Sequence, residues 1–177
     1  MRRALAIDEQ SFGPNHPKVA LRLNNLAHLL QDTNRLAEAE PLTRRALAID
    51  EESFGSDHPE VARDLNNLAR LLQATNRLAE AEPLMRRSLA VDEQSRGPDH
   101  PNVACDLNNL AQLLQATNRL AEAEHLMRRA VGIFAASLGW NHPNTQTVFA
   151  NHLAILAEMK GVSVETLLHE MQAQSET

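Results

Sequence analysis

Histidines are the residues whose type first suggests chemistry, because imidazole binds metals and transfers protons near neutral pH. The sequence holds eight, and four of them precede proline at a spacing of 42 residues: His16, His58, His100 and His142. Packed helices lie about 8–10 Å apart, whereas zinc needs its ligands at about 2 Å. Histidines one repeat apart therefore cannot share a metal ion, and we interpret them as helix starts. We predict neither a metal site nor a cofactor.

No other group of residues forms a catalytic pattern. The Asp-Glu pairs at Asp50-Glu51 and Asp92-Glu93 point their side chains in different directions if they lie on helices. The chain also lacks a Gly-rich phosphate loop and a G-x-S-x-G nucleophile motif. We therefore predict that this chain is not an enzyme.

The composition argues against several kinds of partner. The formal charge is −6, from 17 basic and 23 acidic residues, whereas nucleic-acid binders usually carry a basic face. Aromatic residues, which could stack on bases, make up 3% of the chain, and no apolar run approaches the ~18–20 residues of a membrane span. Cys105 is the only cysteine, which favours an intracellular setting over a disulfide-bonded one. We expect a cytoplasmic protein that binds neither nucleic acid nor membranes.

The sequence contains an internal repeat, from which the helices that carry the histidines and the Asp-Glu pairs can be predicted. Shifting the sequence by 42 residues matches most positions, and residues 43–84 and 85–126 differ at only 10 of 42. Such a period indicates an array of repeated structural units. We predict a single array over residues 1–177. Its segments are a partial second helix (1–14), three repeats (15–55, 56–97 and 98–139) and a divergent final repeat with a capping helix (140–177).

Each repeat is predicted to hold two helices. The first begins at the Asn or Asp before His-Pro, which we take as the capping residue, with proline in the first turn. Asn34 is expected to turn the chain in a left-handed conformation and to cap the second helix. That second helix is bent at Pro41 and ends at Gly55. The equivalent positions are Asn15, Asp57, Asp99 and Asn141 for the cap, Asn76 and Asn118 for the turn, and Pro83 for the bend.

Two polar patterns belong to the outside of the array. Each second helix places a glutamate four residues before an arginine, which is the favourable order for a helical ion pair. The pairs are Glu40/Arg44, Glu82/Arg86 and Glu124/Arg128. After Ser163, a predicted cap, a final amphipathic helix would turn a polar side to water and close the array, as terminal repeats must. Its polar residues are Glu165, His169, Glu170 and Gln172.

The repeat resembles a known family. Its motifs are L-N-N-L-A (Leu23 to Ala27), T-N-R-L-A-E-A-E (Thr33 to Glu40), R-R-A-L-A-I-D-E (Arg44 to Glu51) and G-x-D-H-P. This series resembles the 42-residue tetratricopeptide repeats (TPRs) of kinesin light chains and their bacterial relatives. The resemblance implies an all-α fold, a TPR solenoid of antiparallel helix hairpins wound into an α–α superhelix. It also implies a concave groove, lined by the first helices, that receives extended peptides.

Variation between the copies indicates which surface could bind such a peptide. Positions 18, 21, 28 and 32 of the first helix change between repeats and fall on one stripe, because successive residues are about 100° apart. Asn25 and its equivalents run unchanged through this stripe, with Asn24 and its equivalents beside it. A carboxamide offers both donors and an acceptor to a peptide main chain. The predicted groove residues are Asn24, Asn25, His28, Arg63, Asn66, Asn67, Arg70, Cys105, Asn108, Asn109, Gln112 and Asn151.

The sequence leaves alternatives for the asparagines and for the function. The asparagine rows either bind a guest or only bond neighbouring helices. The predicted function is a non-catalytic scaffold that binds an extended peptide or partner protein in the groove. The alternative is a structural role, either as a spacer in a larger multidomain signalling protein or through self-assembly into a homo-oligomer by an open N-terminal face.

Overall fold

The computed structural model describes residues 2–175, and within them it contains nine α-helices and no strand. No helix in this part of the chain is long and apolar enough to cross a bilayer. The chain divides into two compact units, Met1–Pro98 and Asp99–Thr177. Met1, where the predicted partial helix starts, and residues 176–177, where the predicted final segment stops, lie outside the described residues.

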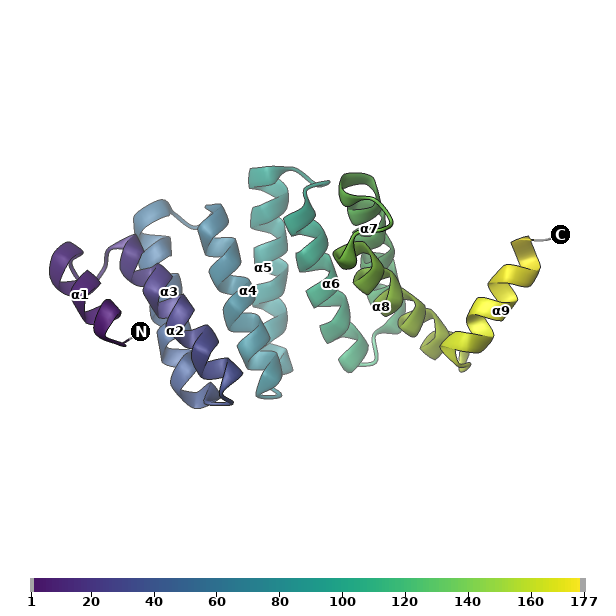
Figure 1. Ribbon diagram of the computed structural model, residues 1–177, viewed down its shortest axis with the longest axis horizontal. Helices are drawn as coiled ribbons and strands as arrows, with labels where there is room; N and C mark the ends of the chain where they lie inside the picture. The colour runs from purple at the N-terminus through teal and green to yellow at the C-terminus, as the bar shows by residue number, and fades with distance from the viewer. Residues whose placement is uncertain (1, 176–177) are drawn as a thin grey trace. The chain divides into compact units, whose positions relative to one another are not determined.

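The first unit packs its helices in chain order. Each helix contacts the next, and α2 also touches α4. Short turns make successive helices antiparallel, so that α2–α3 and α4–α5 are helical hairpins (Figure 1). The bounds are α1 Arg2–Phe12, α2 Pro17–Asp32, α3 Leu36–Phe54, α4 Pro59–Ala74 and α5 Leu78–Arg96.

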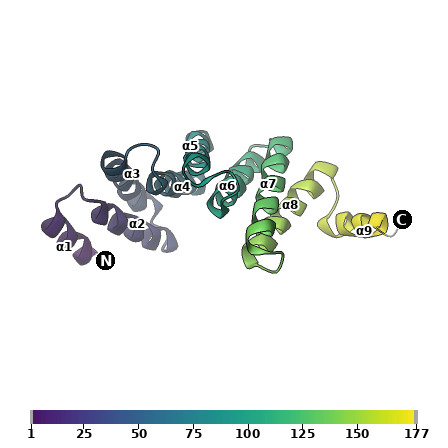
Figure 2. The same cartoon turned by 90° about the horizontal axis from the view of Figure 1, so that it is seen from above.

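The second unit holds one more full hairpin and a different ending. α7 packs against α6 on one side and α8 on the other, and α9 runs away from α8 after the turn (Figure 2). Leu167 of α9 is buried with Leu153 and Ala157 of α8, which joins the last two helices. The bounds are α6 Pro101–Ala116, α7 Leu120–Leu138, α8 Pro143–Lys160 and α9 Val164–Ser175.

Each first helix begins at a histidine cap. The Nδ1 atom of His16 accepts a hydrogen bond from the backbone N–H of Lys18 at 3.2 Å, and Pro17 occupies the first helical position. The helix-start interpretation of the His-Pro motif is therefore confirmed. The predicted capping residue is wrong by one position, because the imidazole reaches an unpaired N–H of the first turn. The caps are His16, His58, His100 and His142. The residues that precede them were predicted as caps and are not: Asn15, Asp57, Asp99 and Asn141.

The turns inside the hairpins use asparagine as predicted. Asn34, Asn76 and Asn118 have positive φ angles of 57°, 58° and 59°, a left-handed conformation that asparagine tolerates better than most residues. They do not cap the second helix, however. Arg35 occupies the N-cap position of α3 without a side-chain capping bond, and its guanidinium pairs with Glu38 at 2.7 Å.

The ends of the second helices follow the sequence closely. α3 ends at Gly55, whose φ of 84° suits glycine alone among common residues. Pro41 and Pro83 do not shorten their helices, since α3, α5 and α7 all have 19 residues although α7 carries His125 at this position. The bend expected at the two prolines stays a prediction.

The core is aliphatic, and its edge shows how repeats cover one another. Leu71 of α4 is 1% exposed because it joins a buried cluster with Leu26 and Ala27 of α2. Leu29, at the equivalent position of α2, is 47% exposed. Within the described residues no earlier first helix covers α2. In the first unit, α2 thus completes the core of α4.

The predicted glutamate–arginine ion pairs of the second helices are confirmed, with exposed arginines and half-buried glutamates. Glu40 and Arg44 are 2.8 Å apart, Glu82 and Arg86 2.9 Å, and Glu124 and Arg128 3.8 Å. The first of these glutamates also bridges to the next repeat, where Arg77 approaches it to 2.8 Å. Burial acts to raise the pKa of Glu40, but the hydrogen bonds from Arg44 and Arg77 outweigh it and lower that pKa.

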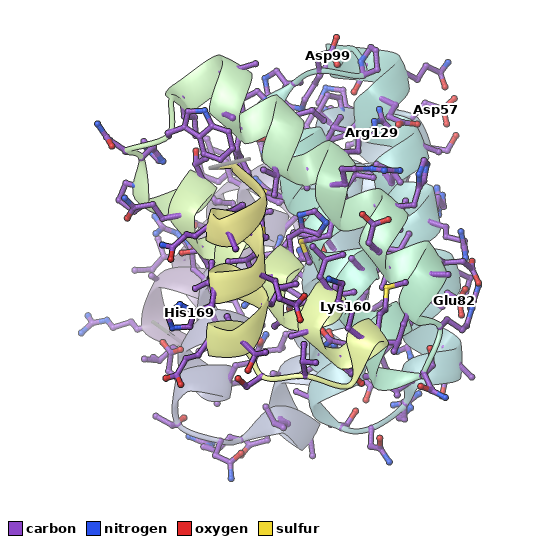
Figure 3. All side chains as sticks on the ribbon, turned by 90° about the vertical axis from the view of Figure 1, so that its right-hand side faces the viewer. Asp57, Glu82, Asp99, Arg129, Lys160 and His169 are labelled. Carbon is purple, nitrogen blue, oxygen red and sulfur yellow. The ribbon has the colours of Figure 1, made fainter. Side chains whose placement is uncertain are left out.

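The final helix exposes apolar as well as polar side chains. Ser163 Oγ accepts a hydrogen bond from the Thr166 N–H at 3.1 Å, which confirms the predicted cap. The predicted polar residues are exposed, and Lys160 Nζ donates to Glu170 at 2.9 Å. Figure 3 views this end of the chain, with Lys160 and His169 labelled. The exposed large apolar residues of α9 are Val164, Leu168 and Met171. The predicted polar side is therefore only part of its exposed surface.

Candidate peptide-binding surface

In the first unit, the predicted stripe lies on the surface of α2 and α4. Asn25 and Asn67 are half-buried, and His28 and Arg70 are exposed. Residues three apart on a helix share a face, so each asparagine lies beside the long polar side chain that follows it. Among the described residues, none of these four side chains has a hydrogen-bond or ion-pair partner. They form a row of unengaged donors and acceptors across two neighbouring helices.

The second asparagine row of this unit has a different role. Asn24 is only 4% exposed, and its Nδ2 donates to Asp64 Oδ1 at 2.7 Å. This bond joins α2 to α4 and agrees with the alternative that the asparagines bond neighbouring helices. The prediction of Asn24 as a groove residue is therefore wrong, because its side chain is buried between α2 and α4 and offers no surface to a peptide. Asn66, at the equivalent place in α4, is half-buried and already has a partner.

In the second unit, asparagines from both rows bond one another. Asn151 Nδ2 of α8 donates to Asn108 Oδ1 of α6 at 3.0 Å, and Asn108 Nδ2 donates to Asn109 Oδ1 at 3.4 Å. Gln112 is half-buried and Cys105 is exposed. The amides of α6 and α8 are therefore more fully engaged with each other than those of the outer row on α2 and α4.

A cavity of about 350 Å³ opens beside the N-terminal ends of α2 and α4. Two large apolar side chains that line it, Leu21 and Phe54, are 47% and 43% exposed. Lys18, Glu60 and Arg63 line it too, so it combines apolar surface with charge. Position 21 belongs to the predicted stripe, although Leu21 was not among the predicted groove residues, and Phe54 of α3 was not predicted because it lies outside the first helices.

Arg63 is held by acidic neighbours. Its guanidinium pairs with Glu60, lies 3.3 Å from Asp64 Oδ1 and lies 3.6 Å from Asp50 Oδ2. These contacts fix the side chain at the wall of the cavity. Within the part of the chain that the structure describes, no three His, Cys, Asp or Glu residues are grouped to hold a metal ion. The surface offers hydrogen-bonding groups and apolar contacts.

Hairpins of similar length, repeated along the chain, define a helical-repeat protein. The chain belongs to the tetratricopeptide repeat family, whose model matches residues 1–52, 21–94 and 65–136. Members of this family are generally non-catalytic scaffolds. No curated protein matches the chain significantly.

Solved structures agree with this assignment. The chain is similar to the kinesin light chain TPR-like repeats of Podosopora anserina, with 25% identity, a TM-score of 0.78, and coverage of 97% of this chain and 82% of that one. It is also similar to BtubC (BKLC) from P. vanneervenii, with 25% identity, a TM-score of 0.79, and coverage of 90% and 63%. The type III secretion chaperone SycD of Yersinia enterocolitica shares the fold at 17% identity, with a TM-score of 0.62 and coverage of 80% and 95%. The predicted family resemblance and the all-α TPR solenoid class are both confirmed.

Proposed function

We propose that this chain is a non-catalytic cytoplasmic scaffold that holds an extended peptide, or an extended segment of a partner protein, across the exposed face of its first helices. The observation that carries the proposal is the outer row formed by Asn25, His28, Asn67 and Arg70, whose side chains have no partner within the described residues. A peptide main chain presents N–H and C=O groups that two carboxamides can satisfy together.

Side chains around this row would supply selectivity. His28 and Arg70 offer hydrogen bonds, and the cavity beside Leu21 and Phe54 can take an apolar anchor of the guest. Buried apolar anchors usually carry much of the binding energy in such contacts. The SycD structure supports the proposal by analogy, since that protein of the same fold was solved in complex with a peptide of the translocator YopD.

The test compares two adjacent asparagine rows. A peptide-array screen on the chain first selects binders, and Kd is then measured by titration calorimetry. The double variant Asn25→Ala/Asn67→Ala removes the outer amides and is expected to weaken binding by about tenfold or more, with Tm changed by less than about 2 °C. Unchanged Kd in this variant would overturn the proposal.

Asn24→Ala is the matched control, because it truncates the neighbouring amide without touching the outer surface. It leaves the buried Asp64 carboxylate without one donor and is expected to cost about 1–3 kcal/mol of stability. Kd should change little once the measurement is made well below Tm. A loss of binding that follows stability equally in both variants would assign the asparagines to structure alone.

Self-assembly is the second candidate function. An apolar cavity of about 520 Å³ lies between α1, α2 and α3, lined by Leu5, Leu26, Leu30 and other residues. Ile7 of α1 and Leu29 of α2 are exposed in the same unit, at 52% and 47%. Light scattering at two protein concentrations separates the functions: a mass that rises with concentration and falls on Leu29→Lys substitution favours self-assembly.

A further inference from the structure

Two aspartates meet in the interior of the first unit. Asp50, in the last turns of α3, is 2% exposed, and Asp64, on α4, is 0% exposed. Each has one side-chain oxygen that is buried without a hydrogen-bond partner, Oδ1 of Asp50 and Oδ2 of Asp64. Two buried carboxylates side by side repel each other, and an unpaired buried acceptor is costly.

The surrounding charges do not neutralise the pair. From α4, Arg63 lies 3.3 Å from Asp64 and 3.6 Å from Asp50, but it also pairs with Glu60. From α2, Asn24 donates to Asp64 at 2.7 Å and is uncharged, while Lys18 lines the nearby cavity. Among the described residues, the guanidinium of Arg63 is thus the one close positive charge for three acids, Asp50, Asp64 and Glu60.

The same register in the preceding repeat contains an ion pair. Asp8 stands 42 residues before Asp50, and Arg22 stands 42 residues before Asp64. Arg22 Nε donates to Asp8 Oδ2 at 2.6 Å, so this position is satisfied by opposite charges. Where the arginine becomes Asp64, a proton between the two carboxyl groups can replace it as the positive partner.

We infer that Asp50 and Asp64 share one proton in the folded protein, and that losing this proton to solvent as the pH rises weakens the contact between α3 and α4. The protonated Asp50 carboxyl donates its hydrogen bond to the Asp64 carboxylate, which in turn accepts from Asn24 of α2. One proton thereby links three helices from two repeats. Since α2 and α4 also carry the outer amide row, loss of the shared proton would change the spacing of the two helices that form the proposed binding surface.

The pKa values agree with the geometry. Burial, reinforced by the Asp64 charge, raises the pKa of Asp50 to about 7. Burial also raises the pKa of Asp64, although Arg63 and Asn24 act in the opposite direction. Between the unfolded value of 3.8 and about 7, the folded state binds more protons than the unfolded state. The stabilisation is thus complete below pH 3.8 and is lost as the pH rises through about 7.

The test is the pH dependence of Tm in Asp50→Asn compared with wild type. The amide that this substitution introduces donates to Asp64 at every pH, so it replaces the protonated acid and does not titrate. We expect the difference, Tm of the variant minus Tm of wild type, to rise by about 3–6 °C between about pH 5 and pH 8. A difference that is constant or falls over this range would overturn the inference.

Asp8→Asn provides the matched control, because it removes the aspartate at the same register one repeat earlier. This residue faces Arg22, and we expect its Tm difference from wild type not to grow with pH. If Asp50→Asn does not fold, the ¹³Cγ shift of Asp50 in the wild-type chain gives the answer by NMR. A midpoint near pH 7 supports the shared proton, and a midpoint below about pH 5 contradicts it.

Discussion

The interface between α3 and α4 and the interface between α7 and α8 occupy the same register in two repeats but differ in chemistry. Asp50 precedes its helix-capping His58 by eight residues and Asp64 follows it by six. At the same distances from His142 stand Phe134 and Val148, which are 2% and 4% exposed. One backbone arrangement therefore accepts either two acids or two apolar side chains. The acid pair is not a requirement of the hairpin fold, which is why a separate role for it is worth testing.

Val148→Asp tests the difference between the two interfaces most directly, because it places an acid in the apolar one. The position equivalent to Asp50 is occupied by Phe134, which has no polar side-chain atom. The new carboxyl group would therefore be buried without a partner there. We expect a loss of about 3 kcal/mol or more in the free energy of unfolding, measured by urea denaturation.

Ala150→Asp is the control for this change, because Ala150 is exposed two residues further along α8. Its effect should stay within about 0.5 kcal/mol. Equal effects of the two variants would mean that Val148 is not in a water-free interface, and the contrast between the two interfaces would fail.

Truncation of Leu29 and of its equivalent, Leu71, tests how neighbouring repeats cover each other. Leu71→Ala removes a side chain that packs against α2, and we expect a loss of about 2–4 kcal/mol. Leu29→Ala truncates the exposed equivalent and should cost less than about 0.5 kcal/mol. Chemical denaturation of both variants measures the difference. Similar losses would show that Leu29 is covered in solution, as self-assembly requires.

The smallest effect is expected at the glutamates through which a second helix contacts the repeat that follows it. Glu40 accepts from Arg77, whereas its equivalent in the third repeat, Glu124, lies 3.1 Å from His152 Nε2. Glu40→Gln should cost about 0.5–1 kcal/mol at neutral pH, since the group is near the surface. Because the pKa of Glu40 is lowered, its contribution is present above the unfolded pKa and lost as the pH falls through the folded one.

The difference between Glu40→Gln and wild type should therefore shrink on acidification toward about pH 3, in the opposite sense to that of Asp50→Asn. Glu124→Gln serves as the comparison at the other interface. Thermal melts at about pH 3, 5 and 7 follow both variants. A Glu40→Gln effect that persists at low pH would argue against an ionised glutamate as its source.

Local signals predicted the hairpins well. Asn34 and Gly55 sit where the backbone needs positive φ, and these two residue types tolerate it, so the helix ends could be read from them. The histidine cap was missed because imidazole is a less common capping group than the Asn or Asp that precedes it. The 42-residue period predicted an array of repeated units, because similar copies bury similar faces, and the resemblance of the motifs implied the family and the fold class.

The roles of adjacent surface residues could not be predicted in the same way. Asn24 and Asn25 are the same residue type one position apart, and only the arrival of Asp64 from α4 decides which of them is buried. Position 64 likewise changes between repeats, from Arg22 to Asp64, and only the structure shows that Asp64 is fully buried. Both features concern contacts between repeats, which depend on the neighbouring copy rather than on local spacing.

Near-identical hairpins raise the question of how each one finds its proper neighbour during folding. A misassembled chain in which α8 docked on α3 would set the Asp50 carboxyl group against Val148, with no Asp64 to share its proton and no amide beside it. Such a product carries an unpaired buried acid, and the native order of hairpins avoids it. The acidic and apolar interfaces thus favour different neighbours, which agrees with the packing of α8 on α7 rather than on α3.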